Sequence, residues 1–187
     1  MKVTAEGFSV CLRMPELADA ESIARNANDR EIFSNVAPAG TFPNPYKVSD
    51  AMGFVEQSNA SFLKGTEFNF AVCVQSTGEL VGMCGITNTN YDERQCEIGY
   101  WIGRDYQGKG YGKEAVMLLL HVAFKALGMR TACAKVLRAN TRSLSLLDSA
   151  GFKRKGVPES SAHGTETLEI ASVDFNGIDA TIVDHEG

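Results

Sequence analysis

Hydrophobic and polar positions along this chain follow two periods, and segments of the two kinds succeed one another. Alternation of apolar and polar residues, as from Phe8 to Arg13, predicts strands, because successive side chains of a strand point to opposite faces. Longer segments with apolar residues three and four positions apart predict helices. Strands are predicted over residues 8–13, 68–75, 80–89, 95–102, 131–137, 152–157 and 165–175, and helices over residues 18–27, 29–36, 49–63, 113–127 and 140–151. This order predicts an α/β fold with a mixed, mostly antiparallel central sheet flanked by helices and a parallel pair of strands near its middle.

The length of the chain predicts one domain. Its 187 residues, 44% of them hydrophobic, are enough for one well-buried core and few for two. No internal repeat or low-complexity linker divides the sequence. We therefore expect a single domain over residues 1–187, with its core over about residues 8–175 and a tail over residues 176–187.

Charge and cysteine content narrow the function classes. The net charge of −5 argues against nucleic acid as a partner and favours a cationic acceptor such as an amine, although solubility alone accounts for it equally well. The first twelve residues do not form a signal peptide, and no run of eighteen apolar residues indicates a membrane span. Five cysteines in odd number, without CxxC spacing, are typical of reduced thiols, so we expect a cytoplasmic protein. The three histidines are too scattered to predict a metal site.

The hexapeptide QGKGYG, residues 107–112, joins a predicted strand to a predicted helix. Glycines allow the sharp bend and the close approach of an anion, and the helix start offers unpaired N–H groups, so the turn is predicted to bind phosphate. Two other phosphate loops fit less well. The pattern GxxxxGK from Gly103 fails because Gly110 stands where Ser or Thr must follow the lysine, and GxGxxG fails in its final spacing.

Two further motifs accompany this loop. Glu97-Ile98-Gly99-Tyr100-Trp101-Ile102 precedes it, and Asn140-x-x-Ser143 followed by Ala150-Gly151-Phe152 comes about thirty residues later. In this order and spacing the motifs resemble the GNAT superfamily of acetyl-CoA-dependent N-acetyltransferases, over about residues 8–175. The chain looks most like the branch that acetylates N-terminal residues of ribosomal proteins, a branch that also contains enzymes acting on small amines.

The resemblance implies acetyl-CoA as the cosubstrate and no metal. Backbone N–H groups of the glycine loop would hold the pyrophosphate, and the edge of the preceding strand would pair with the pantetheine amides as an added strand does. Asn140 would bind the pantetheine, although it is also a natural helix N-cap. The candidate cofactor-binding residues are Tyr100, Trp101, Ile102, Gln107, Gly108, Lys109, Gly110, Tyr111, Gly112, Lys113 and Asn140.

Two residues are candidates for catalysis. The resemblance implies that Glu97 is the base, and burial beside Trp101 would make it more effective. The alternative is that Glu97 lies exposed or pairs with an arginine. The superfamily often protonates the leaving thiolate with a tyrosine after the leucine of its Asn-x-x-Ser motif, but Leu147 occupies that position here. Ser143 therefore becomes the candidate acid, although serine is also common in a first helical turn.

The acceptor site is predicted in the proline-broken segment over residues 37–46. Its aromatic residues Phe42 and Tyr46 would form one wall, unless they only pack the loop onto the core. No cysteine has a basic neighbour in its motif, so we expect direct attack of the amine on the thioester.

Proton chemistry separates the acceptors. An α-amine with a pKa near ~7.7 needs about 1 kcal/mol for deprotonation at pH 7, and a lysine amine near ~10.4 needs about 4 to 5 kcal/mol. The N-terminal α-amine of a protein or peptide is therefore favoured. A small amine or polyamine as acceptor, or a CoA-binding module without catalysis, remains open, and so does the oligomeric state, a homodimer included.

Overall fold

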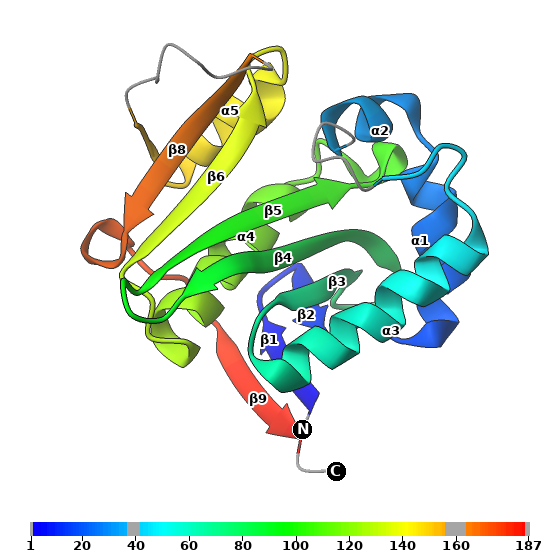
Figure 1. Ribbon diagram of the computed structural model, residues 1–187, viewed down its shortest axis with the longest axis horizontal. Helices are drawn as coiled ribbons and strands as arrows, with labels where there is room; N and C mark the ends of the chain where they lie inside the picture. Colours follow the sequence, from blue (N-terminus) through cyan, green and yellow to red (C-terminus); the bar gives the residue numbers. More distant parts are fainter. Residues whose placement is uncertain (1, 37–41, 156–163, 186–187) are drawn as a thin grey trace.

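Nine strands form one sheet among residues 2–36, 42–155 and 164–185, which are the residues that this computed structural model describes. The order across the sheet is β7-β8-β6-β5-β4-β3-β2-β1-β9 (Figure 1). The strands are β1 (Lys2–Glu6), β2 (Val10–Arg13), β3 (Phe68–Val74), β4 (Leu80–Asn90), β5 (Gln95–Ile102), β6 (Thr131–Leu137), β7 (Lys153–Arg154), β8 (Thr165–Ala171) and β9 (Thr181–His185).

Every neighbouring pair in the sheet is antiparallel except β5 and β6, which run parallel. These two strands pair only from Gln95 to Glu97 on β5, opposite Thr131 to Cys133 on β6. Beyond Glu97 they diverge in a V (Figure 1). One edge of β5 from Ile98 to Ile102 therefore lacks a strand partner in the middle of the sheet. The predicted mixed, mostly antiparallel sheet with a central parallel pair is confirmed.

Helices cover both faces of the sheet. The longer ones are α1 (Ala20–Ala27), α2 (Arg30–Val36), α3 (Val48–Lys64), α4 (Tyr111–His121) and α5 (Thr141–Ser149), and α4 continues into one π-helical turn (Val122–Ala126). Apolar side chains of α1 and α3 pack with Ala71 of β3 and Met83 of β4 on one face. The α4 and α5 side chains pack with Phe70, Ile86 and Ile98 on the other. Alternation along each strand thus feeds two cores, as the sequence pattern predicts.

Most predicted elements lie within two or three residues of the observed ones, but the ends of the chain differ. The predicted tail over residues 176–187 is wrong, because Thr181 to His185 form strand β9, paired with β1 from Lys2 to Glu6. Strand β1 itself was not predicted. Strand β9 is the edge strand and β1 is next to it, between β9 and β2. Neither has a strongly periodic sequence, and pairing with neighbouring strands makes them strands.

The start of α4 is fixed by two polar contacts. Gly110 is its N-cap with φ +87°, so the helix begins at Tyr111, two residues earlier than predicted. The Glu114 carboxylate in the first turn accepts hydrogen bonds from the backbone N–H groups of Ser9 (2.7 Å) and Val10 (3.3 Å). The helix start is thereby tied to the β1–β2 hairpin, which holds the preceding glycine loop against the sheet.

Candidate active site

A cleft of ≈ 1760 Å³ occupies the opening between β5 and β6 and continues past β5 toward α2 and α3. It brings together thirteen of the fifteen predicted site residues. They are Phe42, Tyr46, Glu97, Tyr100, Trp101, Ile102, Gln107, Gly108, Gly110, Gly112, Lys113, Asn140 and Ser143. The side chains of the other two point elsewhere: Lys109 Nζ lies 5.4 Å from the Tyr106 ring centroid, and Tyr111 packs against the core.

The glycine loop closes one end of the cleft. Gly108 (φ +76°) and Gly110 (φ +87°) both have left-handed backbone conformations, and a Cβ at either position would meet open space. Gln107 Nε2 donates to the Ile102 carbonyl (2.9 Å), which fixes the loop to the end of β5. The N–H groups of the first turn of α4, from Tyr111 to Lys113, have no partner within a helix that starts there. The loop therefore offers donors, positive helix-end potential and room for an anion.

Glu97 lies where β5 and β6 begin to diverge. Its Oε2 atom accepts from Lys135 Nζ (2.6 Å) on β6 and from Asn88 Nδ2 (3.1 Å). Asn88 reaches it from a bulge in β4, where its backbone has φ +48°. The alternative was an exposed Glu97 or a pair with an arginine; the structure instead pairs Glu97 with a lysine. Both contacts use Oε2, so Oε1 has no partner among the described residues.

Lys135 is the exposed half of this pair. Its side chain is 58% exposed, and its hydrogen bond to the Glu97 carboxylate raises its pKa. Lys135 therefore stays a cation at physiological pH. Its ion pair with Glu97 connects β6 to β5 at the narrow end of the V.

Asn140 and Ser143 lie across the V from β5. The Asn140 side chain accepts from the Ser143 backbone N–H (3.1 Å), so the predicted N-cap of α5 is confirmed. Ser143 Oγ is 3.0 Å from the Tyr100 hydroxyl on β5. Burial raises the pKa of Tyr100, and the hydrogen bond with Ser143 opposes the shift only in part. The phenol therefore stays protonated at neutral pH and can donate to Ser143.

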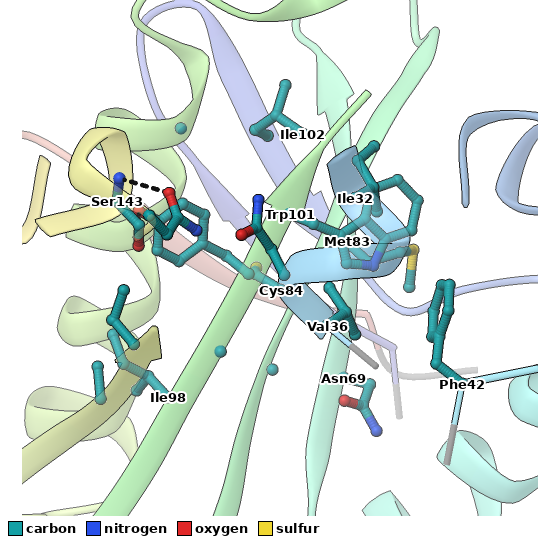
Figure 2. Close-up of a pocket in the computed structure, with 18 of the residues that line it drawn as sticks. Ile32, Val36, Phe42, Asn69, Met83, Cys84, Ile98, Trp101, Ile102 and Ser143 are labelled. Carbon is teal, nitrogen blue, oxygen red and sulfur yellow. Dashed lines mark hydrogen bonds between the residues drawn. The ribbon is translucent and has the colours of Figure 1, made fainter. Parts of the chain in front are cut away.

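The second half of the cleft lies on the opposite side of β5. Figure 2 shows Ser143 and Ile98 on one side of this strand, and Trp101, Met83, Ile32 and Phe42 on the other. The Phe42 and Tyr46 rings stack with centroids 4.7 Å apart, and Tyr46 is buried in the core formed by α1 and α3. Tyr46 thus packs the loop onto the core and also lines the cleft. Residues 37–41 of the predicted segment lie outside the described residues.

Cross-strand register shapes the floor of this second half. Ala71, Met83 and Trp101 form one row across β3, β4 and β5, and Asn69, Gly85 and Gly99 form the next. A Cβ at Gly99 would meet nothing within 4 Å. The sheet surface is therefore hollow at Gly99, between the indole of Trp101 and the carboxylate of Glu97.

Charge divides the cleft into two halves. The described lining residues that precede β5 in the sequence include carboxylates but no Lys or Arg. All four cations that line the cleft come after Glu97 in the sequence. The carboxylates of the half next to α2, α3 and β3 are Glu31, Asp50 and Glu67, and the lining cations, which follow β5 or lie on later elements, are Arg104, Lys113, Lys135 and Arg142. The half with the glycine loop suits a polyanion, and the half between α2, α3 and β3 suits a cation.

Two arginines cross between the halves. Arg142 on α5 contacts Gln107 and lies 3.4 Å from the Glu31 carboxylate on α2. Arg104 is 3.5 Å from Asp29, just before α2. Exposed ion pairs of this kind are weak, so both arginines can turn toward phosphates at low cost. Sequence reasoning missed these residues and Lys135, because each contacts a partner distant in the chain, and it missed Asn88 because a bulge in β4 places it.

Cysteine side chains contribute little to the part of the cleft that the structure describes. All five cysteines are free, and Cys84 is the one that lines the cleft among the described residues. Complete burial raises the pKa of the Cys84 thiol, which makes it a poor nucleophile. Within the described ranges, no group of three His, Cys, Asp or Glu side chains is placed to hold a metal ion, and no helix is long and apolar enough to cross a membrane.

Comparison with known proteins agrees with this geometry. The chain matches the family described as "Acetyltransferase (GNAT) domain" over residues 9–153. It is 34% identical over 148 residues to the uncharacterized N-acetyltransferase p20 of Bacillus licheniformis, which covers 78% of this chain and 80% of p20.

Solved structures share the fold. RimJ of Mycobacterium smegmatis in complex with CoA-disulfide has a TM-score of 0.80 and 21% identity, covering 95% of this chain and 89% of RimJ. Spermidine N-acetyltransferase from Vibrio cholerae in complex with CoA and spermine has a TM-score of 0.73 and 22% identity, covering 89% of this chain and 97% of the other. The family and fold predicted from the three sequence motifs are confirmed. The chain belongs to the GNAT acetyltransferase family and is an acetyl-CoA-dependent N-acetyltransferase.

Proposed function

We propose that this enzyme transfers the acetyl group to the N-terminal α-amine of a protein or peptide, by direct attack of the amine on the thioester. The division of charge in the cleft carries the proposal. Three carboxylates, Glu31, Asp50 and Glu67, line the half next to α2 and α3, and Arg142 pairs with only one of them, Glu31, among the described residues, so this half suits an acceptor that arrives as an ammonium ion. The cations of the other half suit the phosphates of acetyl-CoA.

Acetyl-CoA fits the glycine-loop half in three respects. The helix start and the left-handed glycines accommodate a pyrophosphate, with Lys113 and the two arginines as counter-charges. The edge of β5 from Ile98 to Ile102 offers backbone groups to an extended pantetheine arm, as an added strand would. This path leads the thioester into the V, where Ser143 faces β5.

Glu97 is proposed as the base. Its Oε1 has no protein partner among the described residues and can accept the amine proton, directly or through one water. Lys135 and Asn88 hold the other oxygen and thereby orient the carboxylate. An α-amine needs about 1 kcal/mol for deprotonation at pH 7, so a base of ordinary strength suffices, whereas a lysine amine would need about 4 to 5 kcal/mol.

Ser143 is proposed as the hydrogen-bond donor to the leaving sulfur, with Tyr100 as its positioning residue. The amine nitrogen forms a bond to the acetyl carbon, the carbon–sulfur bond breaks with its electron pair on sulfur, and the proton lost by the amine balances the one gained by the thiol. When Tyr100 donates to Ser143 Oγ, the serine proton is directed toward the sulfur. This pair would stand in for the tyrosine that Leu147 replaces.

Replacing Tyr100 by Phe tests this pair. We expect kcat to fall about tenfold, the factor that a hydrogen bond of about 1.4 kcal/mol supports, while the affinity for acetyl-CoA stays unchanged. The double variant Tyr100→Phe/Ser143→Ala should be no slower than Ser143→Ala, because Tyr100 acts only through Ser143. The control is Tyr91→Phe, which removes a hydrogen bond from the Tyr91 hydroxyl to the Gly65 carbonyl (2.9 Å) outside the cleft. Additive losses in the double variant would contradict the positioning role.

Phe42 and Tyr46 are proposed to contact the acceptor. Phe42 is half-buried and faces Met83 and Trp101 across the cleft, so its ring provides an apolar wall beside the hollow at Gly99 (Figure 2). Phe42→Ala should raise the acceptor KM about tenfold, leaving the Kd of acetyl-CoA unchanged. Steady-state kinetics and a melting curve decide the case, since a ring that only packs the loop would lower the Tm and leave KM as it was.

A thiol-release assay tests the function as a whole. The protein is incubated with acetyl-CoA and a panel of N-terminal peptides, small amines and polyamines, and free CoA is measured over time. We expect the highest kcat/KM with a peptide α-amine. Higher kcat/KM with a polyamine or a small amine would move the enzyme to the alternative acceptor class, and a CoA-binding module would release no thiol with any acceptor.

We also propose that the enzyme works in the cytoplasm. All five cysteines lie on strands as free thiols, which suits a reducing compartment that also supplies acetyl-CoA. Fractionation of cells that express the tagged protein measures this directly.

A further inference from the structure

Three polar side chains on the acceptor side of the cleft are not used by the proposed reaction. Ser58 lies on the sheet-facing side of α3, Glu67 directly precedes β3, and Asn69 is the second residue of that strand. All three line the cleft. We call this group the polar corner.

Each member of the polar corner lacks a partner among the described residues. Ser58 is 3% exposed, and its hydroxyl is buried without a hydrogen bond. Glu67 is half-buried and makes no hydrogen bond or ion pair within the described ranges, whereas Glu31 and Glu97 have ion-pair partners and Asp50 accepts from the Lys47 backbone. Buried polar groups are costly when unsatisfied, so a corner built this way is suited to a ligand that satisfies it.

Sheet register places the corner relative to the reacting amine. Asn69, Gly85 and Gly99 form one row across three strands, and Asn69 Oδ1 lies over Gly85, where a Cβ would stand. Glu67 is two residues before Asn69, so its side chain shares the face that carries Glu97. Because neighbouring strands are about 4.8 Å apart, the corner begins roughly 10 Å from the hollow at Gly99.

The chemistry of the corner matches a primary ammonium ion. Such a group has three N–H donors and no acceptor, and the corner offers a hydroxyl oxygen, a carboxylate and an amide oxygen from three side chains. One negative charge is present, on Glu67, and no Lys or Arg among the described residues pairs with it.

We propose that the polar corner binds a second ammonium group of the acceptor, about 10 Å from the amine that is acetylated. This inference rests on the proposed function and narrows its substrate class to acceptors with two positive charges. The second ammonium comes either from a lysine side chain near the N-terminus of a peptide or from the far end of a polyamine. Both present the same group to Glu67, and the acceptor panel separates them.

The test compares matched acceptors with wild-type enzyme and Glu67→Gln. The peptide arm uses two peptides that differ only in lysine or norleucine at the second position, and the polyamine arm uses spermidine and butylamine. In the arm that contains the true source, Glu67→Gln should raise KM for the dicationic acceptor tenfold or more and change KM for its monocationic partner less than twofold. The affinity for acetyl-CoA should not change.

Two further variants sharpen the result. Glu56→Gln removes one carboxylate from the exposed side of α3, outside the cleft, and controls for a general change of charge. Ser58→Ala removes a hydroxyl that has no partner, so the fold should tolerate it, while KM for the dicationic acceptor should rise. The inference would be overturned if Glu67→Gln changed KM equally for the dicationic and the monocationic acceptor in both arms. It would also be overturned if KM changed for none of the acceptors.

Measuring acceptor binding without turnover tests the polar corner independently of the proposed reaction. Calorimetry of the lysine peptide and of spermidine with the CoA-bound enzyme measures the corner without turnover. Loss of turnover with every acceptor would contradict the proposed reaction, and tenfold weaker binding to Glu67→Gln would still support the corner. Unchanged binding of both ligands would exclude it.

Discussion

Replacing Gly110 by Val is expected to reduce the affinity for acetyl-CoA by roughly 100-fold or more, the largest effect of any change considered for this enzyme. Gly110 has φ +87° and is the N-cap of α4, and a Cβ there would project into open space at the end of the cleft. That space is where the proposed pyrophosphate must approach the N–H groups of the first turn. A branched side chain would block the approach, and calorimetric titration with acetyl-CoA measures the loss.

Backbone strain at residue 110 is a competing explanation for the lower acetyl-CoA affinity of Gly110→Val. A glycine outside the cleft with a similar backbone conformation provides the control. A residue with a Cβ costs about 1 to 2 kcal/mol in the left-handed region, so Gly110→Val will lower stability as well as affinity. Gly78 in the turn between β3 and β4 has φ +72° and also meets open space, but it lies outside the cleft. Gly78→Val should therefore lose similar stability and keep its affinity. Full acetyl-CoA affinity in folded Gly110→Val would remove the glycine loop from the cofactor site.

Replacing Glu97 by Gln is expected to lower kcat/KM about 100-fold at pH 7, the contribution typical of a general base. Glutamine keeps the shape of the side chain and its contact to Asn88, but it cannot take a proton. Lys135 loses its carboxylate partner in this variant, yet its side chain is 58% exposed and remains solvated. The fold should therefore survive, and the loss should appear in turnover.

The pH dependence of the loss identifies its cause. As pH rises through the pKa of the amine, near ~7.7 for an α-amine, more of the acceptor is already neutral and the need for a base shrinks. The deficit of Glu97→Gln should therefore be smaller at pH 9 than at pH 7. The matched control is Glu169→Gln, which breaks a Glu–Lys pair between Glu169 and Lys155 (2.7 Å) outside the cleft. A deficit that is constant with pH would assign Glu97 a role in binding or folding.

Local sequence patterns were sufficient to predict the strand faces, the glycine turn and the start of α5. Alternation on β5 placed Glu97 and Trp101 on one face and Ile98 and Tyr100 on the other, as the structure has them. Glycine spacing in residues 107–112 predicted a sharp turn before α4, and Asn140 predicted the start of α5. Each of these features depends on a few neighbouring residues, because strand period, left-handed backbone and helix capping are local properties of the chain.

Contacts between distant segments were decided by the tertiary structure. Tyr100 meets Ser143 across 43 residues, and Lys135 meets Glu97 across 38. Both contacts exist only because β5 and β6 are parallel, pair over three positions and then diverge. No local pattern specifies where two strands separate, because strand separation depends on contacts between distant parts of the chain.

The strands at the two ends of the chain and the polar corner also depend on tertiary contacts that no local pattern predicts. Residues 181–185 have a weak pattern alone and form β9 because β1 offers an unpaired edge. Ser58, Glu67 and Asn69 carry no motif, and they line the same cleft because α3 packs against one face of β3. The sequence by itself determined the family, the strand faces and the turn of the glycine loop, because the motifs behind them are local. Only the tertiary structure decided which side chains share the cleft, because register and helix packing bring distant residues together.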